Sequence, residues 1–248
     1  MSLVKTLAIV LKSIDWKDTS KIVTLYTRKN GKADIIAKGA RRQNSKYQGV
    51  LESINLIEVI IYLSENRQLQ ILGQATLEKS YPKIRMNYEK TAYVFAIFEL
   101  TNIFLQQGAS DAIFFDFLKT ILDEMENGEI PQIVFWYFIL KLTSYLGFRP
   151  EFDSCHICAR KIVNEDVVFS IREGRVTCNK CMSSAGPQWK LGGSIQSFLS
   201  NLQKTNHKTL SERSYEIRKE FPYTEFLITY LRFHSEEKLD LSALKLLK

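Results

Sequence analysis

The chain has 248 residues, 45% hydrophobic and 25% charged, with a net charge of +7 and a pI of about 9.1, as in an ordinary folded protein. Its most apolar run, residues 133–140, is far shorter than the roughly 20 residues of a membrane span, which argues against a membrane-spanning protein. No secretory signal pattern opens the sequence, so we expect a cytoplasmic protein. Residues 1–50 hold 11 Lys and Arg against 3 Asp and Glu. This surplus favours an anionic partner, either nucleic acid or a membrane surface.

The first 80 residues have the pattern of β-strands. Asn30-Gly31 is a strong hairpin signal between two of the predicted strands. Five runs rich in β-branched and aromatic residues are bounded by turn residues, namely 6–14, 21–27, 32–38, 50–63 and 68–77. Five short strands without a crossover helix predict a small closed barrel over residues 1–80. An OB-fold, which often binds nucleic-acid strands, is the commonest choice, and an SH3-like barrel fits nearly as well.

A basic, polar segment follows the third predicted strand. Gly39 permits a turn there, and Ser45 and its polar neighbours cannot build a core. Four cations in this segment are the candidate nucleic-acid-binding residues: Lys38, Arg41, Arg42 and Lys46. A basic loop that leaves a strand can hold a phosphate backbone, although such a loop can equally be a solvated surface. The segment by itself leaves both interpretations open.

From Tyr81-Pro82 onward the apolar period becomes that of helices, which gives an α+β fold class and an all-helical domain over 81–248. Asp111 is a candidate helix cap, Pro131 a helix start and Gly147 a helix stop. Further helices are expected over 194–203 and 223–233. The helices between residues 88 and 147 are crowded with aromatic residues. These predict a packed core, with a surface groove for an apolar peptide as the alternative.

All four cysteines of the chain occur as two C-x2-C pairs, in a predicted insert at about 151–186: Cys155, Cys158, Cys178 and Cys181. Nineteen residues separate the pairs, and the connection reads as a hairpin that turns at Gly174. This spacing predicts a four-cysteine zinc finger. Four thiolates fill the coordination shell of one Zn²⁺, so the site should be structural. The alternative is a set of buried or redox-active thiols.

Sequence motifs for catalysis are missing. The chain has no G-x-x-x-x-G-K-[ST] phosphate loop, no G-x-S-x-G nucleophile elbow and no H-E-x-x-H zinc motif. We therefore interpret the sequence as that of a binding protein, not an enzyme.

The order of these parts resembles the RecO family of bacterial recombination mediators. The match is carried by A-I-V-L at 8–11, by A-K-G-A-R-R at 37–42, and by L-G-F-R-P at 146–150, which leads into Cys155. The resemblance implies a protein that binds single- and double-stranded DNA and anneals complementary strands. It also implies two protein partners, RecR and the C-terminal tail of single-stranded DNA-binding protein, and a role in helping RecA replace that protein on DNA. DNA contact is carried over to Lys38, Arg41 and Arg42, and the expected location is the bacterial nucleoid.

Other interpretations remain open at this point. The main rival is an RNA-binding OB/zinc protein of translation or transcription, and another is an accessory domain of a nucleic-acid enzyme. The acidic, Phe-ending tail implied by the resemblance needs a pocket for one aromatic ring beside a cation. Candidates for that cation are Lys119, Lys141 and Arg149.

Overall fold

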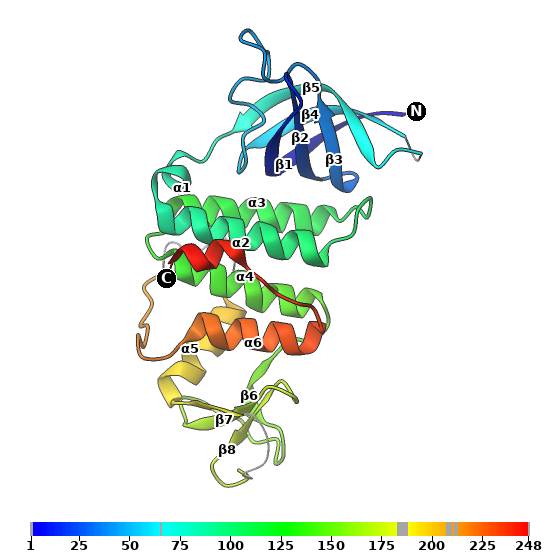
Figure 1. Cartoon of the computed structure of the whole chain (residues 1–248). Coiled ribbons are helices and arrows are strands. Elements are labelled where there is room, and N and C mark those ends of the chain that lie inside the picture. Colours follow the sequence, from blue (N-terminus) through cyan, green and yellow to red (C-terminus); the bar gives the residue numbers. More distant parts are fainter. Residues whose placement is uncertain (1, 65, 183–187, 207–209, 211–212, 248) are drawn as a thin grey trace. The chain divides into compact units, whose positions relative to one another are not determined.

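The computed structural model describes residues 2–64, 66–182, 188–206, 210 and 213–247 (Figure 1). Its contacts divide the chain into two compact units. Unit 1 comprises Met1–Asn127 with Leu241–Lys248, and unit 2 comprises Gly128–Asp240. The expected change from strands to helices near residue 80 falls inside unit 1.

Unit 1 contains a closed five-stranded barrel. Its strands are β1 (Ser2–Trp16), β2 (Ser20–Thr27), β3 (Gly31–Ala37), β4 (Leu56–Leu63) and β5 (Leu69–Lys79). The strand order is β1-β2-β3-β5-β4, and β4 pairs back to β1. Only β3 and β5 run parallel, while the other pairs are antiparallel. This connectivity is that of an OB-fold, which confirms the predicted α+β fold class with an N-terminal OB barrel.

The predicted hairpin at Asn30-Gly31 joins β2 to β3. Gly31 has a φ of +62°, and a Cβ atom there would lie 2.0 Å from the carbonyl oxygen of Ala109. The position therefore needs glycine for its backbone conformation and for the close approach of the 105–109 segment.

The fourth strand is shorter than predicted. It begins at Leu56, whereas residues 50–55 form turns in which Ile54 has a φ of +79°. Leu51 and Ile54 are almost fully buried. Their apolar character suggested a strand, but these side chains serve the core from a turn, so the prediction of a strand over 50–63 was wrong at its start.

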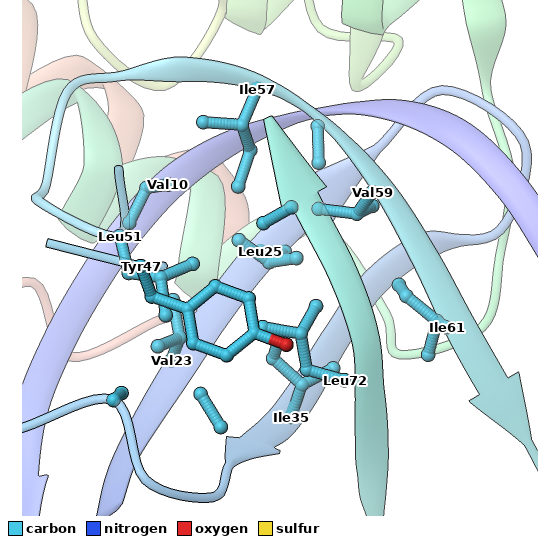
Figure 2. Close-up of a cluster of buried hydrophobic side chains, with 14 residues drawn as sticks. Val10, Val23, Leu25, Ile35, Tyr47, Leu51, Ile57, Val59, Ile61 and Leu72 are labelled. Atoms are coloured by element: carbon cyan, nitrogen blue, oxygen red, sulfur yellow. The ribbon is translucent and has the colours of Figure 1, made fainter. Parts of the chain in front are cut away.

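The barrel interior is filled by side chains that alternate along each strand. Figure 2 shows this cluster, which includes Val10, Val23, Leu25, Ile35, Ile57, Val59, Ile61 and Leu72. Residues of the 38–51 loop complete it, because Ala40, Tyr47 and Leu51 are buried with the strand residues. Side chains of this loop therefore fill part of the barrel core.

Three helices and a 3₁₀ helix complete unit 1: α1 (Pro82–Met86), α2 (Tyr88–Phe104), α3 (Ala112–Asn127) and η2 (Ser242–Leu247). The predicted cap is present, since the Asp111 carboxylate accepts a hydrogen bond from the backbone of Phe114 at 2.9 Å. The rings of Phe114 and Phe115 pack against Tyr26 of β2, with centroids 5.9 and 6.2 Å away. These aromatic residues hold α3 on the barrel.

Unit 2 combines helices with a four-stranded sheet of order β6-β8-β7-β9. Its elements are α4 (Pro131–Tyr145), β6 (Glu151–Cys155), β7 (Val167–Ser170), β8 (Arg175–Cys178), β9 (Gln188–Leu191), α5 (Gly193–Lys204) and α6 (Tyr223–Ser235). The predicted start at Pro131 and the predicted hairpin turn at Gly174, with φ +64°, are both confirmed. Phe135 and Phe138 of α4 are fully buried, as a packed core requires.

In the described part of the chain, no helix is both long enough and apolar enough to cross a bilayer.

Candidate nucleic-acid interface and metal centre

The basic loop, defined as residues 38–50, is a compact series of turns. Gly39 opens it with a φ of +71°, and its carbonyl accepts a hydrogen bond from the backbone of Arg42 at 3.2 Å. Two further turns follow. In the first, the backbone N–H of Ser45 donates to the carbonyl oxygen of Arg42 at 3.0 Å, and in the second, that of Gln48 donates to the carbonyl oxygen of Ser45 at 3.2 Å. This regular backbone fixes the spacing of the cations along the loop.

Tyr47 anchors the basic loop to the barrel. Figure 2 shows the Tyr47 side chain among the core residues, and Tyr47 is only 8% exposed. Its hydroxyl donates a hydrogen bond to the carbonyl oxygen of Gly73 on β5 at 3.1 Å. The Asn55 amide donates to the carbonyl oxygens of Gly49 and Val50 at 2.8 and 3.0 Å. The loop is thus held at both its middle and its end.

Arg41 connects the basic loop to the β1–β2 turn. Its Nη1 donates to the carbonyl oxygen of Lys17 at 2.9 Å, and its Nε lies 3.1 Å from the Asp15 carboxylate. The Arg41 backbone N–H also donates to the carbonyl oxygen of Thr19 at 2.9 Å. Arg41 therefore makes several contacts within the protein, and the sequence pattern did not distinguish it from Arg42.

The other three candidate DNA-binding residues point to solvent. Lys38, Arg42 and Lys46 are exposed, and none of them forms an ion pair with a described residue. The Lys46 ammonium lies 5.1 Å from the centroid of the Tyr47 ring. Unpaired cations on a rigid loop can each contact a phosphate oxygen.

In unit 2, the sheet brings the four predicted ligands together. The Sγ atoms of Cys155, Cys158, Cys178 and Cys181 all lie within 4.8 Å of one another, and those of Cys158 and Cys178 are 3.9 Å apart. A tetrahedral zinc site with Zn–S bonds of about 2.3 Å has S···S edges of roughly 3.8 Å. The cluster therefore fits one tetrahedral metal ion. Residues 183–186, at the end of the predicted insert, lie outside the described residues.

Each cysteine pair sits on a tight turn at a strand end. The backbone of Ala159 donates to the carbonyl oxygen of Cys155, and that of Cys181 to the carbonyl oxygen of Cys178, both at 2.9 Å. Cys155 ends β6 and Cys178 ends β8, and these two strands are neighbours in the sheet. The fold thus brings the two cysteine-bearing turns next to each other.

The surroundings favour the thiolate form at Cys178 and disfavour it at Cys181. Interaction with the Arg160 guanidinium lowers the pKa of Cys178 to about 6, whereas the neighbouring Cys158 and Cys178 raise the pKa of Cys181. The Cys178 backbone N–H lies 3.4 Å from the Sγ of Cys155. Arg160 is itself held by a bidentate pair with Glu165, at 2.8 and 2.5 Å. A thiolate at neutral pH is the form that binds a metal. Four thiolates leave no open coordination position, so a metal bound here would stabilise the fold and would not take a substrate.

The chain combines a closed OB barrel, an architecture that often binds nucleic-acid strands, with a four-cysteine cluster that could hold a metal ion. Comparison with known families identifies the group to which the chain belongs. The family model "Recombination protein O N terminal" matches residues 1–81, and the model "Recombination protein O C terminal" matches residues 85–242. The chain belongs to the RecO family, as its resemblance implied, and this membership supports a role in DNA repair and recombination.

Curated relatives named "DNA repair protein RecO" match over most of their length. The protein of Desulforamulus reducens is 25% identical over 96% of this chain and 92% of its own length. The protein of Caldanaerobacter subterraneus is 29% identical over 95% of this chain and 94% of its own length. The protein of Shouchella clausii is 32% identical over 71% of this chain and 67% of its own.

Proposed function

We propose that this protein is a non-catalytic recombination mediator that binds single- and double-stranded DNA and anneals complementary strands. In this role it would act with RecR to help RecA replace single-stranded DNA-binding protein, at the bacterial nucleoid. The observation that carries the proposal is the set of three unpaired cations, Lys38, Arg42 and Lys46, which the basic loop displays on an OB barrel. Family membership adds the repair context.

Phosphate contacts explain why such a protein would accept many sequences. Each cation that neutralises a phosphate releases counterions, which gives affinity that falls with salt and ignores base sequence. Arg41 was expected to contribute in the same way. Because its Nη1 and Nε already have partners within the protein, we propose that its main role is to hold the loop against the β1–β2 turn.

The proposal is tested by strand annealing. Two complementary strands coated with single-stranded DNA-binding protein should anneal faster when the protein is added, and the Lys38→Ala/Arg42→Ala/Lys46→Ala variant should lose most of this acceleration. The matched control replaces three exposed cations of unit 2, Lys161, Arg172 and Arg175, and should anneal like the wild type. Competition with RNA of equal length separates the rival function, because preference for RNA would favour a protein of translation or transcription.

We also propose that unit 2 receives the tail of single-stranded DNA-binding protein. Two of the expected cations meet at Gln203 of α5: Lys141 donates to its carbonyl oxygen at 2.7 Å, and Arg149 to its side-chain oxygen at 3.1 Å. Burial, together with the nearby Arg149, lowers the pKa of Lys141. The Glu151 carboxylate already lies 3.8 Å from Arg149 Nε, and a peptide carboxylate would add a second negative charge beside the two cations. Lys119 belongs to α3 in unit 1 and is half-buried.

The metal we propose for the cysteine cluster is one structural Zn²⁺. All-sulfur tetrahedral sites favour zinc or iron–sulfur clusters, and the C-x2-C pairs joined by a short hairpin match the zinc pattern.

A further inference from the structure

A band of apolar side chains runs around the outside of the OB barrel. The strand registers place Ile14 opposite Ile22, Ile22 opposite Ile36, and Ile36 opposite Ile71. Ile71 then lies opposite Tyr62 of β4. The residues on either side of these along the strands, such as Val23, Ile35 and Ile61, belong to the barrel core. The band therefore faces outward, because successive side chains of a strand point to opposite faces.

Trp16 extends this apolar surface at the β1–β2 turn. It lies two residues beyond Ile14 on β1, hence on the same outer face, and both side chains are 42% exposed. Tyr62, at the opposite end of the band, is 38% exposed. Apolar side chains that adjoin one another on an exposed surface, as Trp16 and Ile14 do, mark interaction sites more often than single exposed residues do.

The charge around the band is uneven. At the Trp16 end, the exposed cations Lys12, Lys17, Lys38 and Arg42 have no acidic partner among the described residues. At the Tyr62 end, the outward-facing Lys5 of β1 is paired with Glu58 of β4 at 2.8 Å. The Trp16 end therefore offers apolar surface beside four cations that form no ion pair with a described residue, against one exposed acid, Asp18, that forms none either. Near the Tyr62 end the corresponding cation is Arg67 of the β4–β5 turn, so positive charge is more concentrated at the Trp16 end.

Arg41 gives this arrangement a fixed geometry. Its contacts with Lys17 and Asp15 tie the basic loop to the turn that carries Trp16. As a result, the cations of the loop and the exposed ring lie along one edge of the barrel.

We propose that Trp16 and the adjoining part of the band, Ile14, Ile22 and Ile36, form a platform for the unpaired bases of single-stranded DNA. One base stacks on the Trp16 ring, its neighbours lie on the isoleucines, and the phosphates face Lys17, Lys38 and Arg42. The nearby positive charge favours a polyanion as the ligand over an apolar protein surface. The exposed Trp16 ring favours single-stranded DNA, because only bases that are not paired in a duplex can stack on it. This inference rests on the proposed DNA-binding function and adds how the protein distinguishes single strands from duplexes.

The experiment compares the full-length wild type with Trp16→Ala, Trp16→Phe and Tyr62→Ala on three probes. These are a single-stranded oligothymidine, an oligonucleotide of the same length with abasic residues, and a duplex of that length. Trp16→Ala should weaken binding to oligothymidine roughly 5- to 150-fold, as expected for the loss of one base-stacking ring, with less than about a twofold change on the abasic strand and the duplex. Trp16→Phe should retain most of the affinity. Tyr62→Ala, the matched control on the same band, should bind oligothymidine within about twofold of wild type.

Equal weakening on all three probes by Trp16→Ala would overturn the platform, because it would show a loss of phosphate contact or of fold. Unchanged affinity for oligothymidine would overturn it as well, and so would equal losses from Trp16→Ala and Tyr62→Ala. Failure of the wild type to bind any of the probes would instead refute the proposed DNA-binding function itself.

Discussion

Tyr47 should control both the stability of the barrel and the shape of the basic loop. Tyr47→Phe removes only the hydrogen bond from its hydroxyl to Gly73, a loss of about 1 kcal/mol in the free energy of unfolding. Tyr47→Ala also removes a ring that is 92% buried within the barrel core, and aromatic-to-alanine changes in cores cost about 3–5 kcal/mol. The difference between the two variants isolates the packing of the ring.

Urea unfolding followed by far-ultraviolet circular dichroism measures these values. With a denaturant slope of about 2 kcal/mol/M, Tyr47→Phe should shift the midpoint by about 0.5 M and Tyr47→Ala by about 2 M. DNA affinity, measured well below the midpoint, should be retained in Tyr47→Phe and reduced in Tyr47→Ala, because the cations then lose their common support. The reasoning is refuted if the two variants unfold at the same urea concentration, or if folded Tyr47→Ala binds DNA like the wild type.

Three other changes test separate parts of the molecule. Arg42→Ala should flatten the dependence of log affinity on log salt by about one, equally for all DNA sequences, and an unchanged slope would exclude a phosphate contact. Wild-type protein purified without added metal should carry one zinc per chain by elemental analysis. The Cys178→Ser variant should lose this zinc, and its unit 2 should be less stable, while its barrel still binds DNA. A wild-type protein that is stable without bound metal would contradict this prediction. A hydrogen bond from Arg28 holds the pKa of Asp116 below its usual value, so this pair stabilises the fold above the unfolded-state pKa near 4 and loses its effect as pH falls through the lower folded-state pKa. Asp116→Asn should therefore lower the urea midpoint slightly at pH 7 and by less at pH 2, whereas an equal difference at both pH values would exclude the ion pair as its cause.

Local chemistry was enough to predict many elements. Asn30-Gly31 predicted its hairpin because few other residues adopt the turn, and Asp111 predicted the start of α3 because its carboxylate satisfies a free backbone N–H. The cysteine spacing predicted the cluster, since two residues between cysteines form the same tight turn in many proteins. These signals depend only on residues close together in the chain.

The rest depends on contacts between distant residues. Arg41 and Arg42 look equivalent in the sequence, and the contacts of Arg41 depend on where the fold places the Lys17 and Asp18 carbonyl groups and the Asp15 carboxylate. The turn at 50–55 was mistaken for a strand because Leu51 and Ile54 reach the core from a loop. The outer apolar band could not be predicted either, because it depends on the pairing register of all five strands.

The division of unit 1 between the two ends of the chain has a consequence for its synthesis. Ser242 donates a hydrogen bond to the Glu99 carboxylate, and the Tyr88 hydroxyl donates one to the carbonyl oxygen of Leu246, so η2 packs on α2. Residues 241–247 leave the ribosome only after all of unit 2 has been made. The barrel and its helices therefore emerge early with one face of α2 still uncovered, for the time that more than a hundred residues take at about 5–20 residues per second, or roughly 5–25 seconds. During that interval the nascent chain has an exposed helix face that the finished protein has covered.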